Sequence, residues 1–337
     1  MSTAKKQLVL DALNNRKTDR VPVGFWFHFT EGDEVFQGLE DPSIIIKNIQ
    51  GHEKFYRSFQ PDFVKLMSDG FFRYPNAALT KAKHASDLKS LRPLVARHPW
   101  IEKQIDLAKS LTDSFGKEVL TFYNIFSPAT FFKFLFGDGE AGNKALANFL
   151  NEDPEAVRHA LDVIAEDLSI LASRVISEGG TDGIYLSVQN IQDKRISKET
   201  YRHSITPSEK KVLASANASG ENNILHICGY EGTRNDLTTY ADYDAKAFNW
   251  AVTVEGVSLG DGKKIFGDKA VIGGFASSKG SLLHAGSKEE IQNYTAKVLE
   301  HAGTRGVILG GDCTVPSDID LNRLDWVRQN AAAQKRI

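Results

Sequence analysis

Short apolar stretches rich in β-branched and aromatic residues alternate along the chain with longer segments of helical periodicity. The eight candidate strands cover residues 21–27, 62–67, 118–123, 183–188, 223–227, 248–252, 270–275 and 306–310, of which 248–252 has the weakest pattern. Strands that alternate with helices are typical of parallel sheets with right-handed crossovers. Eight such units predict an α/β fold, a closed (β/α)8 TIM barrel, with an N-terminal helical extension before the first strand.

Two predicted helices carry clear start signals. Asp153 lies directly before a helical pattern that begins with proline and covers 154–177, so we expect Asp153 to cap it. Ser287 and Glu290 have the spacing of a capping box. The polar segment 215–222 is the nearest candidate for a domain linker, but we interpret it as a loop that leads into the fifth strand.

The bulk composition agrees with one globular domain, which we predict to cover residues 1–337. Hydrophobic residues make up 41% of the chain and charged residues 25%, enough for a large core. The formal net charge is -2, and the sequence has neither the basic excess nor the runs of like charge that would indicate a nucleic-acid partner. No signal-peptide core and no stretch of the ~20 apolar residues that span a bilayer is present. We therefore predict a cytoplasmic protein without a membrane partner.

The two cysteines of the chain each lie in a short motif of their own. His226 and Cys228 are two residues apart at the end of the fifth predicted strand, and this spacing puts both side chains on one face of an extended segment. Cys313 follows the eighth predicted strand. Because the C-terminal ends of all barrel strands surround one mouth, we expect these three side chains to converge there. Three such ligands with one open position are typical of a catalytic zinc.

The ligand types indicate the chemistry. A zinc ion with two thiolates and one imidazole would lower the pKa of a bound substrate thiol and leave it nucleophilic toward an alkyl donor. Activation of water would also be possible, but histidine- and carboxylate-rich sites suit it better. Without a metal, the same residues could be two buried cysteines with a hydrogen-bonded core histidine, or a redox pair, although the spacing is not C-x-x-C.

Further polar and aromatic residues follow the predicted strands, and we expect them at the same mouth. Asp69 follows the second strand, and we assign it a catalytic role in which it orients a substrate or polarises a ligand; turn formation is the alternative. Asn190 follows the fourth strand. The predicted substrate-binding residues are His28, Phe72, Tyr123, Gln189 and Trp250. Packing between barrel and helices is the alternative for the aromatic ones.

The HICG segment, the GGDCTVP segment and the PDFVK segment (61–65) resemble the uroporphyrinogen decarboxylase superfamily, over residues 6–333. The resemblance implies a (β/α)8 barrel and one of two activities. One is cofactor-free decarboxylation of uroporphyrinogen, and the other is zinc-dependent methyl transfer from a corrinoid protein to a thiol such as coenzyme M. Methyltransferases of this group carry a His-x-Cys pair after one strand and a distant Cys after the last, which His226, Cys228 and Cys313 match.

Several positions depart from the decarboxylase pattern. The stretch 26–34, where decarboxylases carry an arginine that grips the porphyrinogen carboxylates, has no arginine and three acidic residues. Phe134 stands where the resemblance places a decarboxylase tyrosine, and Cys313 stands where it places a histidine. Among these decarboxylase residues, only the aspartate has a counterpart, Asp69.

The sequence therefore predicts an enzyme, a methyltransferase with Zn²⁺ as cofactor, a small-molecule thiol as substrate and a methylcorrinoid donor on a partner protein. The first alternative is a decarboxylase that acts on a porphyrinogen or a smaller acid. The second is a non-catalytic barrel that binds a ligand or a corrinoid protein. Arg234 and Lys194 are candidates for the anionic end of a substrate, with surface charge as the alternative for both.

Overall fold

The computed structural model describes residues 3–137, 139–189, 193–229, 234–267 and 269–333. Eight parallel strands are present: β1 (Val23–Gly24), β2 (Phe63–Leu66), β3 (Leu120–Phe126), β4 (Gly183–Val188), β5 (Ile224–Ile227), β6 (Ala247–Trp250), β7 (Ala270–Phe275) and β8 (Val307–Gly311). They are ordered β1-β8-β7-β6-β5-β4-β3-β2. The N–H of Asp62 donates to the carbonyl of Val23 at 3.0 Å, which joins the two ends of this order. The predicted (β/α)8 barrel is confirmed.

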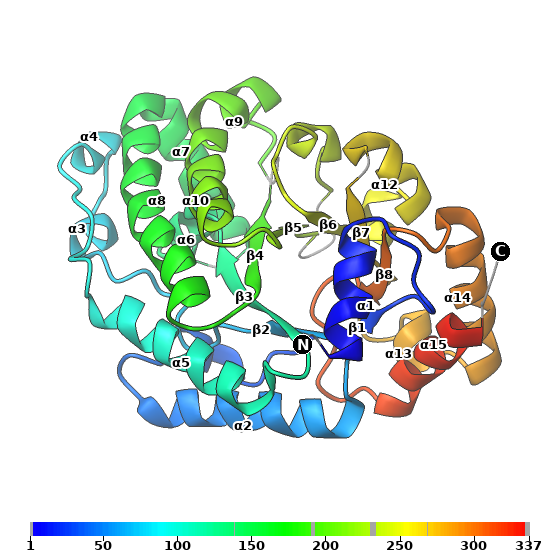
Figure 1. Cartoon of the computed structure of the whole chain (residues 1–337). Helices are drawn as coiled ribbons and strands as arrows, with labels where there is room; N and C mark the ends of the chain where they lie inside the picture. The colour runs from blue at the N-terminus through cyan, green and yellow to red at the C-terminus, as the bar shows by residue number, and fades with distance from the viewer. Residues whose placement is uncertain (1–2, 138, 190–192, 230–233, 268, 334–337) are drawn as a thin grey trace.

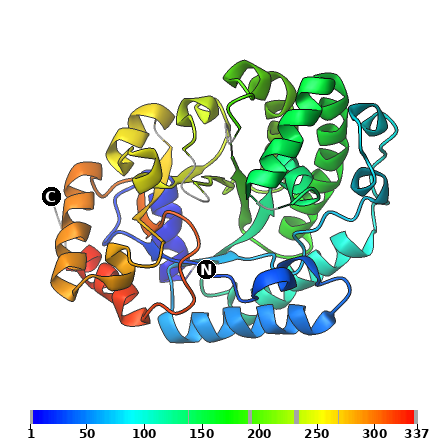
Figure 2. The same ribbon diagram turned by 180° about the vertical axis from the view of Figure 1, so that it is seen from behind.

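Helices form an outer layer around the strands, as Figures 1 and 2 show from opposite sides. They are α1 (Ala4–Leu13), α2 (Pro42–Phe59), α3 (Ala77–Thr80), α4 (Ala85–Leu88), α5 (Pro99–Phe115), α6 (Pro128–Phe134), α7 (Gly139–Glu152), α8 (Pro154–Ser177), α9 (Lys198–Ser204), α10 (Thr206–Ser219), α11 (Val252–Glu255), α12 (Leu259–Phe266), α13 (Leu282–Ala285), α14 (Lys288–Ala302) and α15 (Leu321–Ala333), with the 3-10 helices η1 (Gly32–Phe36) and η3 (Leu237–Tyr240). Helix α1 is the predicted N-terminal extension. Within the described residues, no helix has both the length and the apolar character that a membrane crossing requires.

Side-chain caps fix the starts of two helices where the sequence predicted them. The Asp153 carboxylate accepts hydrogen bonds from the first free N–H groups of α8, and Ser287 and Glu290 form the capping box of α14. The prediction of a loop at 215–222 was wrong in its first part, because α10 continues to Ser219. Ala216 in this stretch is fully buried, so tertiary packing carries the helix through residues that favour turns by themselves.

The strand ends differ from the prediction by a few residues. β1 is only two residues long and starts directly after Pro22, which has no N–H to donate to a neighbouring strand. β3 extends to Phe126, three residues beyond the predicted end. This extension matters for the site, because the residues that follow β3 then start α6 directly above the strand ends.

An apolar cluster fills much of the barrel interior and packs against α1. It contains Val9, Ala12 and Leu13 of α1 together with Trp26, Phe63, Met67, Leu120, Phe122, Tyr185, Ile224, Ala247, Ala270, Ile272 and Ile308. We call this cluster the barrel floor. The C-terminal end of the interior carries buried polar residues instead, so the two ends of the same barrel have different chemistry.

Candidate metal centre

Three potential ligands converge at the C-terminal mouth of the barrel. His226 lies in β5, Cys228 follows that strand, and Cys313 follows β8. Their ligand atoms all lie within 4.8 Å of one another, and the two sulfur atoms are 3.9 Å apart. A tetrahedral zinc with bonds of 2.0–2.3 Å holds its ligand atoms about 3.3–3.8 Å apart. The three side chains therefore need only a small contraction to share one ion.

The surroundings of His226 leave one ring nitrogen available to a metal. Its Nδ1 donates to Oδ1 of Asn249 in β6, which is fully buried. The amide group of Asn249 is fixed in this orientation because its Nδ2 donates to the carbonyls of Ile272 at 2.9 Å and Gly311 at 3.3 Å. The Nε2 atom of His226 is buried and has no hydrogen-bond partner among the described residues. An orphaned buried acceptor of this kind fits a metal ligand.

The two sulfur atoms also suit a soft cation. The Cys228 thiol beside Cys313 is the main reason that the pKa of Cys313 lies well below its ordinary value, and His226 and the charge of Lys65 act in the same direction against the effect of burial. A readily formed thiolate is the form of cysteine that binds zinc. The donor set of one imidazole and two sulfurs thus fits Zn²⁺.

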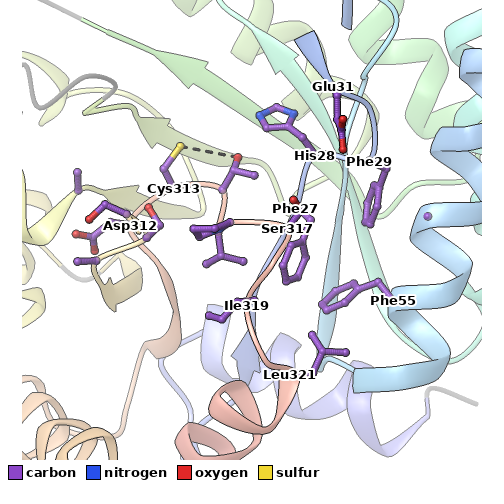
Figure 3. Close-up of a pocket in the computed structure, with 18 of the residues that line it drawn as sticks. Phe27, His28, Phe29, Glu31, Phe55, Asp312, Cys313, Ser317, Ile319 and Leu321 are labelled. Atoms are coloured by element: carbon purple, nitrogen blue, oxygen red, sulfur yellow. Dashed lines mark hydrogen bonds between the residues drawn. The ribbon is translucent and has the colours of Figure 1, made fainter. Parts of the chain in front are cut away.

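A cavity of about 1040 Å³ opens beside Cys313, between the loop after β1, helix α2 and the segments after β7 and β8. Figure 3 shows its lining, with the aromatic rings of Phe27, Phe29 and Phe55 on one side. Its ionisable lining residues are His28, Glu31, Lys54, Asp312 and Cys313. None of the described residues that line it is an arginine, so this cavity offers no guanidinium group to a polycarboxylate.

His28 and Asp69 form a pair at the edge of this cavity. Nδ1 of His28 lies 2.8 Å from Oδ1 of Asp69, and the other carboxylate oxygen accepts the N–H of Phe29 at 2.7 Å. Burial alone would lower the pKa of His28, but the charge and hydrogen bond of Asp69 raise it above its ordinary value. Asp69 is fully buried and does not line the cavity, whereas His28 does, so Asp69 acts on the cavity through His28.

Two predicted substrate-binding residues lie near the mouth but outside the cavity lining. Phe72 packs against Phe126 and Phe134, with ring centroids 4.6 and 5.8 Å away, and lies 5.9 Å from the ring of His28. Gln189 accepts a hydrogen bond from Nζ of Lys133 at 2.7 Å. Asn190, which follows it, lies outside the described residues.

Tyr123 and Trp250 face the helix layer and not the mouth, which corrects their predicted placement. The Tyr123 hydroxyl donates to Gln104 in α5 at 3.1 Å, and the indole N–H of Trp250 donates to the carbonyl of Val257 at 2.9 Å. Successive strand residues point to opposite faces, and the inward positions here are the neighbours of these two. The prediction placed them at the right strand ends but on the wrong face.

Three buried polar residues at or beneath the mouth carried no role in the sequence-based prediction. Asn249 and Lys65 point into the barrel from β6 and β2, and Lys133 of α6 is buried beside Gln189. A signal for the first two was present, because each interrupts an otherwise apolar strand. A buried polar residue in a strand is costly unless it has a partner or a function.

Known proteins that are similar in sequence or in fold include methyltransferases. The chain is 22% identical over 226 residues to the methylcobamide:CoM methyltransferase MtbA of Methanosarcina acetivorans, a match that covers 67% of this chain and 62% of that protein. In solved structures, a methyltransferase from Methanosarcina mazei has a TM-score of 0.70 at 18% identity and covers 99% of both chains. A B12-independent methionine synthase from Shewanella has a TM-score of 0.58 at 11% identity, over 93% of this chain and 97% of that one.

Structural likeness at such identities shows the shared barrel alone, and the alignment to MtbA spans less than two thirds of that relative. The decisive match is the profile of uroporphyrinogen decarboxylase (URO-D), which fits residues 73–333. This stretch starts after β2 and contains six of the eight strands, all three candidate ligands and the helices between them. The resemblance predicted from the sequence is confirmed, and the chain belongs to the uroporphyrinogen decarboxylase family.

Proposed function

We propose that this protein is a zinc-dependent methyltransferase that moves a methyl group from a corrinoid donor, held by a partner protein, to a small thiol. The observation that carries the proposal is the convergence of His226, Cys228 and Cys313 with an orphaned imidazole nitrogen. These three side chains would hold Zn²⁺. The ion would supply acidity, because a metal lowers the pKa of a coordinated thiol so that a thiolate exists at neutral pH.

The surrounding residues of the mouth position these groups and handle the proton. Asn249 holds His226 in the tautomer with a lone pair on Nε2. His28 has no hydrogen bond on its Nε2 among the described residues, and it lines the cavity with Cys313 (Figure 3). We assign to this nitrogen the transfer of the thiol proton to solvent. Asp69 stabilises the imidazolium that forms, because its carboxylate is bonded to Nδ1.

The cavity beside Cys313 is the proposed approach for the methyl donor. Its volume of about 1040 Å³ and its aromatic and hydroxyl-bearing walls suit a large, flat and mostly apolar group. The thiolate sulfur would attack the methyl carbon, the bond from that carbon to the donor would break, and the donor would keep the electron pair. The name of the Methanosarcina acetivorans relative, which combines a methylcobamide with a thiol coenzyme, supports this pair of substrates.

The test is a metal and transfer assay on the purified protein. We expect about one zinc per chain and methylation of 2-mercaptoethanesulfonate by methylcobalamin, followed through the absorbance change of the corrinoid. Full activity in a metal-free preparation would contradict the zinc proposal. Turnover of uroporphyrinogen at a comparable rate would favour the decarboxylase instead, although the described residues that line the cavity include no arginine for its carboxylates.

A further inference from the structure

Lys65 is a buried lysine inside the barrel. It lies in β2 between Phe63 and Met67, two members of the barrel floor, and its relative exposure is 3%. Its ammonium group makes no hydrogen bond and no ion pair with the described residues. It lies over two aromatic rings, with Nζ 4.4 Å from the ring centroid of Tyr185 and 5.3 Å from that of Trp26. Two cation–π contacts stabilise a buried ammonium group by less than the free energy that its desolvation costs.

The same two rings connect Lys65 to the candidate metal centre. The ring of Tyr185 lies 5.9 Å from the imidazole of His226, and Trp26 meets that imidazole edge-on at 6.5 Å. Lys65 is therefore one aromatic layer away from a proposed zinc ligand, on the inner side of the barrel. It lies beneath the mouth and not among the residues that line the cavity.

The acidic groups that act on Lys65 are few. Burial lowers the pKa of Lys65 to about 8, and the charges of Cys313, Cys228 and Asp69 oppose this change. Asp69 is already committed, because both of its carboxylate oxygens are hydrogen-bonded to His28 and Phe29. The thiolates of Cys313 and Cys228 are therefore the negative charges near Lys65 that are not hydrogen-bonded in the way that Asp69 is.

The net charge of the zinc site suggests a role for the ammonium group of Lys65. Two cysteine thiolates, a neutral imidazole and Zn²⁺ sum to zero. When an acceptor thiol loses its proton to solvent and binds as a thiolate, the buried centre gains one negative charge. We propose that Lys65 is the counter-charge for this thiolate, so that the site takes an anionic sulfur in preference to a neutral ligand. This inference rests on the proposed function and names a positioning residue for it.

The test compares two ligands in the Co²⁺-substituted protein, whose visible spectrum reports ligand binding without turnover. The probes are 2-mercaptoethanol, a neutral thiol that binds as its thiolate, and imidazole, which binds as a neutral molecule. In Lys65→Met, we expect thiol binding at pH 7 to weaken on the order of tenfold, since the attraction between two opposite unit charges in a buried site is lost. Imidazole binding should change less than about twofold, since a neutral ligand does not feel the missing charge.

Two further variants keep the result interpretable. Lys65→Arg retains the cation, and we expect it to preserve the preference for thiol over imidazole. Lys65→Gln is a second uncharged side chain that replaces the methionine variant if that variant fails to fold, and we expect the same loss of thiol preference. Equal weakening of both ligands would mean that Lys65 only shapes the site, and unchanged thiol binding would mean that its charge is irrelevant; either result overturns the inference.

Failure of the proposed function has a different signature. If the wild-type protein binds no Co²⁺ at the His226, Cys228 and Cys313 site, or binds it but takes up no thiol, the methyltransferase proposal and the role of Lys65 fall together. If the wild-type protein binds both metal and thiol while the uncharged variants bind thiol equally well, only the role of Lys65 is rejected.

Discussion

The two ends of the barrel interior place polar groups in opposite ways. At the N-terminal end, the buried carboxylate of Asp62 is fully paired: Arg20 donates two hydrogen bonds to it at 2.6 Å, and the N–H of Val23 donates a third at 2.8 Å. At the C-terminal end, the Nε2 atom of His226 has no partner among the described residues, and Lys65 lies over aromatic rings. The paired carboxylate of Asp62 stabilises the fold, and the unpartnered Nε2 of His226 leaves a group available for chemistry.

This difference shows how one barrel can separate stability from function. The barrel floor is mostly apolar and packs against α1, so burial of its side chains stabilises the barrel. At the mouth, the imidazoles of His226 and His28 are each held through Nδ1 alone, by Asn249 and Asp69 respectively. Substitutions at the two ends should therefore have separable effects, with stability changing at one end and metal or proton chemistry at the other.

The largest expected effect is on stability, from Asp62→Ala at the paired end. Removal of this carboxylate leaves the Val23 N–H and the Arg20 guanidinium without their buried acceptor where β1 meets β2. We expect the free energy of unfolding to fall by about 3 kcal/mol, at the lower end of the range for a broken buried pair, because Arg20 is partly exposed. Urea denaturation measures it, and zinc affinity at low temperature should be unchanged.

Asp113→Ala is the matched control, since Asp113 forms an exposed pair with Lys109 at 2.9 Å. We expect it to change the free energy of unfolding by less than about 0.5 kcal/mol. A loss of zinc affinity in Asp62→Ala that exceeds the loss of stability would show that the two ends are coupled.

Cys313→Ser should lower zinc affinity by more than about a hundredfold, beyond the range typical of residues that only support a ligand. Methyl transfer should be lost with the metal, while the stability of the metal-free protein should stay close to the wild type. Competition with a chelator measures the affinity. Ser277→Ala, which also lines the cavity, is the control and should retain zinc. Normal zinc binding by Cys313→Ser would remove this residue from the proposed site.

Asn249→Ala should reduce zinc affinity about 10- to 100-fold, because His226 loses the acceptor that fixes its tautomer. The control is Asn124→Ala. Asn124 is also a buried asparagine of the barrel, but its Nδ2 donates to Ser68 and not to a ligand. If both variants lose the same zinc affinity, the effect comes from a disturbed interior and not from the orientation of His226.

The smallest expected effect is on the protonation of His28. In Asp69→Asn, the carboxylate charge that raises the pKa of His28 is gone, so the midpoint of its NMR titration should move to lower pH. The pair of His28 and Asp69 stabilises the folded protein at pH values below the ordinary histidine pKa. This stabilisation is lost as the pH rises through the raised pKa of His28 in the folded state. An unmoved His28 midpoint would contradict the pairing.

Much of the fold was predictable because the strands are short apolar runs between amphipathic helices. All eight predicted strands are present, including the weakest one around Phe248. The convergence of His226, Cys228 and Cys313 was also predictable, because strand order and direction in a barrel bring those chain positions to one mouth. The errors within the site concern the face of the strand on which a side chain lies. Tyr123 and Trp250 were assigned to the mouth, although the alternation of side chains along a strand turns both toward the helices.

The sequence by itself determined the eight-unit barrel, because the period of its apolar residues specifies each element, and it determined which three residues have the chemistry to hold zinc. The tertiary structure alone decided their environment. It placed Asn249 beside His226, Asp69 beside His28, and the ammonium group of Lys65 over the rings of Tyr185 and Trp26. These contacts join residues of different strands or of the segments that follow them. Side-chain pairing across a barrel depends on strand register and on the face that each residue takes, and no local sequence pattern records either.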